Sequence, residues 1–348
     1  MDSLLYFILS KNGDIRLKIA LVYLGNTLPR YVIDNLNYLK DVVPSGSLIF
    51  ISEDNKSLEK VARIGIETWK CSDPNDSWNK VKAKLSHPEA FRNGFWFKTT
   101  ARFFAILEYM QNTEESVLQI EADVWIAKNF PFTKFEEIID KIAFPLESMT
   151  TGAASILWIP NLELMQTLIK FAEIEFSKDG HSTDMTILGQ FSIQNPNITF
   201  VLPSLLSNSR NLENNLSEVL DNSLSHHVQF DGLFDPLTYG LFLLGIDARN
   251  SRGYKILFSR PSAHTVPAET YNYSFKEDIL HVESRTKEKL PLYCLHVHSK
   301  DRSIFNNRHR ASTLIKRIEQ SQYGVRKEFE MIIFLKQGIH FLKKKIYR

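Results

Sequence analysis

The start of the chain predicts two buried strands joined by one helix. Residues 16–24 and 47–52 are short, mostly apolar runs, and each is followed by turn-forming or charged residues. Between them, residues 30–41 carry apolar side chains at helical spacing. Parallel neighbouring strands need a crossover connection of this kind, whereas antiparallel strands need only a tight turn. This pattern therefore predicts an α/β fold built on a parallel sheet.

The same two strands indicate where a ligand would bind. Open parallel sheets bind ligands outside the carboxyl ends of their strands. Gly25 and Asn26 follow the first predicted strand, and Glu53 follows the second. These three are candidate ligand-binding residues on position alone, and position alone also fits ordinary loop residues.

Residues 116–126 are the most informative segment of the chain. They are predicted to form a strand, with Glu121 and Asp123 near its carboxyl end. Because side chains alternate along a strand, these two carboxylates would share one face and repel each other unless a cation or water separated them. Mg²⁺ and Mn²⁺ accept such oxygen ligands. The sequence predicts a divalent-metal site with Asp123 as a ligand, while a solvated strand end explains the same pattern.

Two cations lie on one face of a predicted helix. Residues 95–110 are mostly apolar, and Lys98 and Arg102 are four residues apart, so they are neighbours on the helix surface. Paired cations at the edge of an apolar helix suit a diphosphate. They equally suit side chains that extend along the helix into solvent. The sequence favours neither interpretation.

A pair of histidines lies near the end of a late predicted strand. Within residues 292–300, His296 and His298 share one face, and Lys300 follows them. A neutral imidazole from either one would complete a metal site begun by Asp123. A lone histidine is usually structural, and a pair at this spacing is less often so.

Two further segments carry candidate residues. The small side chains of residues 148–153, between two predicted strands, would let a ligand approach the backbone. Residues 185–191 are predicted to be helical, and either Thr183 or Asp184 would cap that helix. The cap explains Asp184 without a functional role, although a capping residue can also face a site.

Composition excludes several classes of protein. The formal charge of the 348-residue chain is only +2, which argues against a nucleic-acid-binding domain. The two cysteines, Cys71 and Cys294, form no cluster, so neither a disulfide framework nor structural zinc is expected, and a reducing cytoplasm fits them. The apolar segment at residues 1–10 is too short to span a bilayer. The expectation is a cytoplasmic protein, soluble or peripheral on the membrane.

The organisation expected along the chain is one catalytic domain and a tail. Residues 1–310 form the domain, in which residues 205–235 are an irregular insertion. Residues 311–348 form a basic C-terminal tail, and its apolar side chains recur every three or four residues. Such an amphipathic helix binds anionic membrane surfaces. It also suits packing on the domain or on a second subunit.

These features occur in an order that resembles the GT-A class of glycosyltransferases, in particular bacterial enzymes of capsule and lipopolysaccharide assembly. The resemblance covers roughly residues 16–305. Its order is the strand–helix–strand start, the strand that ends in Glu121-Ala122-Asp123, the small-residue loop, Ser182-Thr183-Asp184 and the late His296-Val297-His298-Ser299-Lys300. The stretch from Phe234-Asp235-Pro236 to Gly245-Ile246-Asp247-Ala248-Arg249-Asn250 is also similar to segments of such enzymes. The sequence departs from the Asp-x-Asp motif of that class, because Glu121 stands at its first position.

The resemblance implies a Rossmann-like mixed sheet flanked by helices and a metal-dependent sugar transfer. The donor would be a nucleotide sugar, in particular a UDP-sugar, with Mn²⁺ or Mg²⁺ as cofactor and a lipid-linked or oligosaccharide acceptor. It implies that Asp123 and either His296 or His298 bind the metal and that Glu121 serves the ribose or the metal. It further implies Asp184 as the base of an inverting reaction. A retaining reaction needs no base there, and the sequence leaves both open.

Two other functions fit parts of the pattern. A nucleotidyltransferase uses a similar sheet and metal. It normally has a glycine-rich basic loop after the first strand, however, and Gly25-Asn26-Thr27-Leu28-Pro29 has one glycine and no lysine. The other alternative is a carbohydrate-binding protein of the same fold without catalysis. Binding of UDP together with Mn²⁺ separates a transferase from such a protein.

Overall fold

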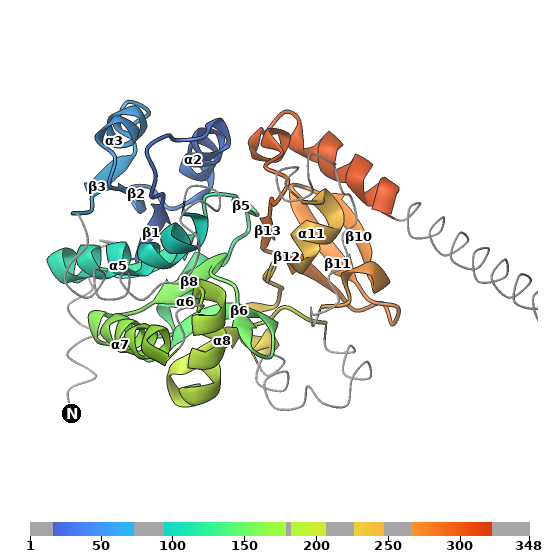
Figure 1. Ribbon diagram of the computed structural model, residues 1–348. Helices are drawn as coiled ribbons and strands as arrows, with labels where there is room; N and C mark the ends of the chain where they lie inside the picture. The colour runs from blue at the N-terminus through green and yellow to red at the C-terminus, as the bar shows by residue number, and fades with distance from the viewer. Residues whose placement is uncertain (1–16, 73–93, 179–181, 207–225, 247–265, 322–348) are drawn as a thin grey trace, which may run out of the picture. The chain divides into compact units, whose positions relative to one another are not determined.

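The computed structural model describes residues 17–72, 94–178, 182–206, 226–246 and 266–321 (Figure 1). The chain divides into two compact units. The first comprises residues 1–124 and 131–202, and the second comprises residues 125–130 and 203–348. Residues 1–10, most of the insertion (207–225) and the amphipathic part of the tail (325–348) lie outside the described residues. The domain boundaries expected at residue 310 and around the insertion stay predictions.

The first unit is built on a mixed sheet whose leading half is parallel. In this half the strands lie in the order β3-β2-β1-β4, and β1 pairs in parallel with both β2 and β4. The buried apolar runs of the sequence form these strands, which are β1 (Leu17–Val22), β2 (Leu48–Ser52), β3 (Glu67–Lys70) and β4 (Ser116–Ile120). The predicted strand–helix–strand unit and the predicted mixed α/β sheet are confirmed.

The other half of this sheet is mostly antiparallel. Strand β8 pairs antiparallel with both β4 and β6, and β6 pairs in parallel with β9 and antiparallel with the short β7. These strands are β6 (Ile142–Ser148), β7 (Thr151–Gly152), β8 (Ile156–Ile159) and β9 (Thr199–Leu202). The carboxyl end of β4 therefore lies where the parallel half meets the antiparallel half. Strand order also reverses at β4, because the chain runs from β1 out to β3 and then returns to place β4 on the other side of β1. Ligands bind at such reversals in open α/β sheets.

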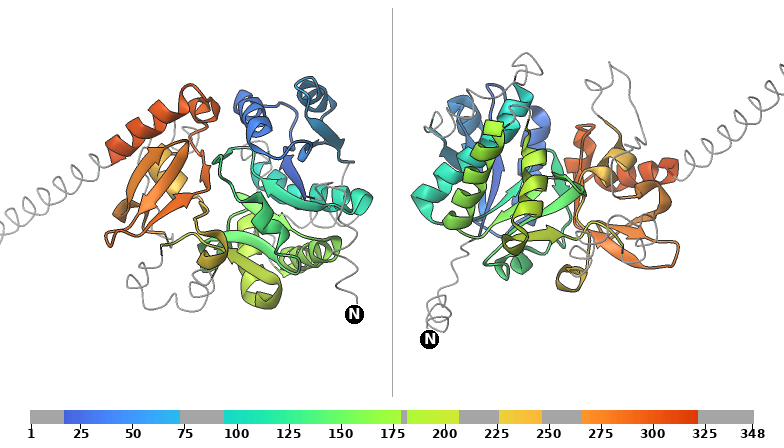
Figure 2. Two further views of the ribbon diagram at one scale, coloured as in Figure 1. Left: turned by 180° about the vertical axis from the view of Figure 1, so that it is seen from behind. Right: turned by 60° about the horizontal axis from the view of Figure 1, so that its bottom comes forward.

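Helices flank this sheet (Figure 2). Helix α2 (Arg30–Val42) connects β1 to β2, and α3 (Asn55–Ala62) connects β2 to β3. The chain then returns through α5 (Phe95–Thr113), and right-handed crossovers put this helix on the opposite face from α2 and α3. Helices α7 (Leu162–Lys178) and α8 (Asp184–Gln194) pack against α5. The described part of this unit also contains the short helix α6 (Phe132–Glu136) and the 3-10 turn η1 (Pro196–Ile198).

The second unit contains a three-stranded antiparallel sheet and a separate two-stranded one. The first sheet has the order β10-β11-β12, and the second pairs β13 with β5. Short helices and a helix over residues 310–321 complete the described part of this unit. Its elements are β5 (Val124–Ile126), α10 (His227–Phe230), α11 (Thr238–Leu244), η4 (Ala268–Thr270), β10 (Asn272–Lys276), β11 (Ile279–Glu283), β12 (Lys289–Leu292), β13 (Cys294–His296) and η5 (Arg302–Phe305).

The strand predicted over residues 116–126 is interrupted. Strand β4 ends at Ile120, a turn follows in which the Val124 N–H donates to the Glu121 carbonyl at 3.0 Å, and β5 then joins a different sheet. Glu121 and Asp123 thus lie in a turn between two strands. The prediction that they share one face of a continuous strand is wrong. The late strand is also shorter than predicted, because β13 ends at His296 and His298 lies in the turn that follows.

Two expectations from composition can be compared with the described residues. Cys71 and Cys294 are both buried, and neither forms a disulfide in the part of the chain that the structure describes. Among the described helices, none is both long and apolar enough to cross a bilayer.

Candidate functional site

The turn that carries Glu121 and Asp123 is held by hydrogen bonds to its backbone. Besides the bond from Val124 to Glu121, the Glu121 N–H donates to the Ser155 carbonyl at 3.1 Å. From α2, the side-chain nitrogen of Asn35 donates to the carbonyls of Ala122 and Val124, each at 3.0 Å. The turn thus has a defined conformation at the carboxyl edge of the sheet.

Arg102 is buried between two carboxylates. Its two terminal nitrogens form ion pairs, one with Glu121 and the other with Asp184, the latter at 2.5 Å, and its Nε donates to the Thr99 carbonyl at 2.9 Å. Charge-assisted bonds of this kind give an arginine a single geometry. Arg102 was predicted as a ligand-binding cation, and the described contacts show it joining α5, the β4–β5 turn and α8.

Asp184 is the first residue of α8, and Thr183 is its N-cap. The Thr183 hydroxyl accepts from the Thr186 N–H at 3.2 Å, and the Thr186 hydroxyl accepts from the Thr183 N–H at 2.8 Å, which completes a capping box. The cap is therefore Thr183 rather than Asp184. Burial raises the pKa of Asp184 above its usual range; the charge of Arg102 acts in the opposite direction, and the carboxylate of Glu121 adds to the rise.

In the second unit, His296 is fixed through its backbone by a buried aspartate. The Asp235 carboxylate accepts from the N–H groups of His296 at 2.8 Å and Gly240 at 2.9 Å, and also from those of Leu237 and Tyr239. A Cβ on Gly240 would lie 1.9 Å from the His296 carbonyl oxygen, so α11 approaches β13 as closely as a glycine permits. The His296 and His298 rings are stacked, with centroids 4.0 Å apart.

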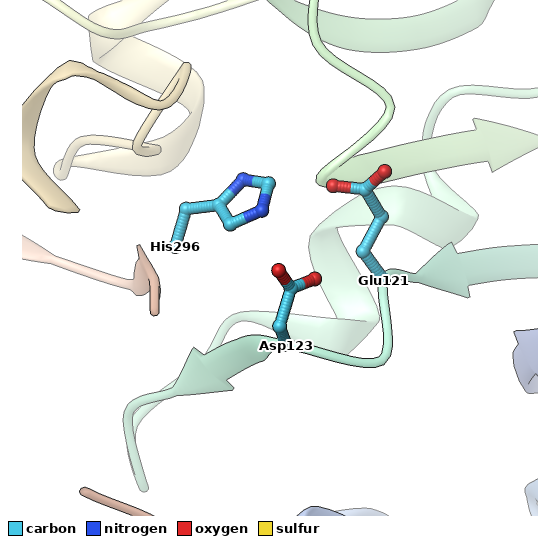
Figure 3. Close-up of side chains that lie close together, drawn as sticks. All are labelled: Glu121, Asp123 and His296. Carbon is cyan, nitrogen blue, oxygen red and sulfur yellow. The ribbon is translucent and has the colours of Figure 1, made fainter. Parts of the chain in front are cut away.

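Glu121, Asp123 and His296 are close together. One ligand atom from each can be chosen so that all three lie within 4.8 Å of one another. In Figure 3 the two carboxylates and the imidazole point toward one another. The chain itself accounts for this closeness, because β5 starts directly after Asp123 and pairs with β13, which ends at His296. His298 is not part of this group of three, although its ring lies against His296.

The other candidate residues lie in the loops after β1, β2 and β13 or on helix α5. Lys98 lies beside the loop after β1, since a Cβ on Gly25 would be 3.5 Å from its Nζ, and Asn26 is exposed in the same loop. Glu53 is exposed just after β2, and Lys300 follows β13 with a left-handed φ of 55°. The described contacts therefore bring Gly25 and Lys98 together, while Glu53 has no described contact with them.

The small-residue loop serves packing. A Cβ on Gly152 would lie 2.6 Å from Leu188, and one on Gly189 would lie 2.0 Å from the Thr150 carbonyl oxygen. These glycines let α8 lie directly against residues 150–152. The approach of a ligand to this backbone stays a prediction.

Sequence reasoning missed Asn35 and the role of Asp235. Asn35 lies within a helical pattern whose neighbours at helical spacing are apolar, and a polar residue on such a face is the one available signal. Asp235 was noticed only as part of a similar segment. Its four backbone partners come from residues near in sequence and from a distant strand, and the distant one was not visible.

No family model matches the chain, and no curated protein matches it. Among solved structures it is similar to the galactosyltransferase LgtC in complex with donor and acceptor sugar analogues, with 12% identity and a TM-score of 0.43 over 59% of this chain and 82% of that chain. It is also similar to the glycosyltransferase GlyE of Streptococcus pneumoniae TIGR4, with 16% identity and a TM-score of 0.38 over 91% of this chain and 64% of that chain. A third similar structure is a cytidylyltransferase of Leptospira borgpetersenii, with 10% identity and a TM-score of 0.28 over 52% of this chain and 86% of that chain. At identities and TM-scores this low, these likenesses establish no function for this chain.

Proposed function

We propose that this chain is a metal-dependent glycosyltransferase that uses a nucleotide-sugar donor. The observation that carries the proposal is the grouping of Glu121, Asp123 and His296 at the carboxyl edge of a mixed α/β sheet. This edge is where α/β sheets bind nucleotides. The grouping joins residues far apart in the sequence.

The three side chains suit a divalent cation. Two carboxylates and one imidazole are ligands that Mn²⁺ and Mg²⁺ accept. An ion with ligands at about 2.1 Å holds any two of them at most about 4.2 Å apart, and the ligand atoms here already lie within 4.8 Å of one another. Asp123 is only 9% exposed and His296 5%, so a charge here is poorly hydrated and gains from a bound cation. We assign the metal to Asp123 and His296, with Glu121 serving the metal or the ribose.

Positive charge at the site would stabilise the leaving nucleoside diphosphate. A bound divalent cation neutralises charge that develops on the departing diphosphate. Lys98, next to Gly25, and Lys300, after β13, supply fixed cations in this proposal, with Gly25, Asn26 and Glu53 lining the nucleotide side. Arg102 acts mainly through Glu121, since both of its terminal nitrogens are engaged by carboxylates.

Asp184 is the proposed base for the acceptor hydroxyl. Burial raises its pKa, which strengthens a carboxylate as a proton acceptor. Its ion pair with Arg102 fixes its position.

The finer parts of the proposal follow the resemblance in sequence. We propose a UDP-sugar as donor, a lipid-linked or oligosaccharide glycan as acceptor, and a place in bacterial surface-polysaccharide synthesis on the cytoplasmic side of the membrane. A nucleotidyltransferase is the competing function. The loop after β1 has one glycine and no lysine of its own to hold a triphosphate, and this favours the transferase.

Calorimetry with UDP and Mn²⁺ tests the proposal. The full chain should bind UDP only when Mn²⁺ is present, and Asp123→Ala should remove this metal-dependent binding and the release of UDP from UDP-sugars. Glu121→Gln should have a smaller effect. The control is Asp140→Ala, which removes an exposed carboxylate outside the group of three. Near-normal metal-dependent activity in Asp123→Ala would show the site assignment to be wrong, and preferential binding of a nucleoside triphosphate would favour the nucleotidyltransferase.

A further inference from the structure

Asn35 is a polar residue on the apolar face of a helix. It is fully buried on α2, as are Val32, Leu36 and Leu39, which lie three, one and four residues from it. An apolar side chain would pack at such a position without the free-energy cost of taking a polar group out of water. A buried amide at this position needs hydrogen-bond partners to offset that cost.

Its hydrogen bonds identify that partner. The single Nδ2 atom donates to the carbonyls of Ala122 and Val124, both at 3.0 Å. Because only the nitrogen of the amide can donate, two carbonyl acceptors fix which way the amide points. Its Oδ1 has no hydrogen-bond partner among the residues that the structure describes. The side chain thus serves this one turn.

The two carbonyls lie on either side of Asp123 in the chain. One belongs to the peptide unit directly before Asp123 and the other to the peptide unit that follows Val124. Holding both limits rotation of the backbone at Asp123 and so fixes the direction in which its side chain leaves the backbone. The Val124 N–H bond to the Glu121 carbonyl closes the same turn.

We propose that Asn35 is a positioning residue that holds the Glu121–Asp123 turn in the conformation that binds the metal. The part that concerns the metal rests on the proposed function, and the part that concerns the turn does not. Groups that orient metal ligands through hydrogen bonds typically change metal affinity by about 10- to 100-fold when they are removed. Asn35 would act at one remove further, through the backbone of the ligand.

The test uses the full chain with Asn35→Leu, which keeps the size of the side chain and removes the donor. Asn35→Ala is the second variant, in case the first packs poorly. The control is Trp158→Phe, which also removes a buried side-chain donor, here the bond of 2.7 Å to the Ile138 carbonyl in the same unit. Two quantities are measured: hydrogen exchange at the Val124 amide, and the affinity for Mn²⁺ alone by electron paramagnetic resonance.

The expected result is faster exchange at Val124 and a Kd for Mn²⁺ raised by about 10- to 100-fold in both Asn35 variants, with neither change in Trp158→Phe. If the unaltered chain binds no Mn²⁺, the proposed function fails, yet faster exchange at Val124 still supports the positioning of the turn. Unchanged exchange in both Asn35 variants overturns the inference. Faster exchange with unchanged Mn²⁺ affinity overturns its metal part.

Discussion

At the scale of single residues, Arg102 is a buried cation that forms ion pairs with two carboxylates. Arg102, Glu121 and Asp184 come from three separate elements of the first unit, and all three are largely shielded from water. Removing one partner of a buried ion pair is costly because the other charge remains buried. Asp184 is the member that can be neutralised while Arg102 keeps a partner in Glu121.

We therefore expect Asp184→Asn to fold and to separate chemistry from binding. If Asp184 is the base, turnover should fall by at least about 100-fold, the lower bound for loss of general base catalysis, while Mn²⁺-dependent UDP binding stays the same. Steady-state assays of transfer and calorimetry on the same preparation measure the two. Asp140→Asn, which neutralises an exposed carboxylate, is the control. Unchanged turnover would leave Asp184 with a structural role beside Arg102.

The same variant should change how stability depends on pH. Burial raises the pKa of Asp184 in the folded chain, so the folded state keeps a proton that the unfolded state releases above about 3.9. Stability from this group is complete below that value and is lost as the pH rises through the folded-state pKa. As the pH rises through this window, the unfolding free energy of the unaltered chain should fall relative to that of Asp184→Asn. Denaturant titrations of both chains at several pH values measure the difference.

At the scale of elements, the contact between α11 and β13 depends on one glycine. A side chain at Gly240 would meet the His296 carbonyl at 1.9 Å, so the helix and strand cannot both stay in place. Gly240→Ala should lower the unfolding free energy by about 1–3 kcal/mol, the usual cost of overpacking, and should also weaken Mn²⁺ binding because His296 moves.

Gly189→Ala is the matched control for that prediction. Its Cβ would meet the Thr150 carbonyl at 2.0 Å in the first unit, so it introduces a similar clash away from His296. Thermal unfolding and Mn²⁺ titration of both variants compare stability with affinity. Mn²⁺ affinity in Gly240→Ala equal to that of the unaltered chain would mean that the position of α11 does not reach the metal site.

The elements differ in how far sequence could predict them. The β1–α2–β2 unit was predictable because each element is local and its apolar spacing is regular. The break at residues 121–123 was not, because Val124, Trp125 and Ile126 continue an apolar run while pairing with a strand from much later in the chain. Candidate residues at strand ends were predictable from the sheet. The pairing of Arg102 with Asp184 was not, since it depends on how α5 and α8 pack.

At the scale of the whole molecule, the C-terminal tail remains a prediction. Its apolar stripe and its cations lie outside the described residues, at Ile332, Leu335, Ile339, Leu342 and Ile346 and at Lys336, His340, Lys343, Lys344, Lys345 and Arg348. Each cation would gain about 1 kcal/mol near anionic lipid. The full chain should float with anionic vesicles, and a chain shortened to end at Gln322 should not.

Neutral vesicles provide the control for flotation, since they keep the apolar contribution and remove the attraction between charges. Both chains should float less with them. Equal flotation of the full and shortened chains with anionic vesicles would mean that the tail packs on protein instead. The proposed lipid-linked acceptor would then have to reach the chain by another route.

The short segment of residues 125–130 bears on how the protein can be made. It belongs to the second unit, although the rest of that unit begins only at Pro203. During synthesis β5 leaves the ribosome long before its partner strand β13 is made. Strand β5 therefore stays unpaired while the first unit folds from the residues that precede and follow residues 125–130 in the sequence. Pairing between strands so distant in sequence is slow. A fragment that starts at Pro203 would lack β5 altogether, so β13 would present an unpaired edge and the fragment would tend to aggregate.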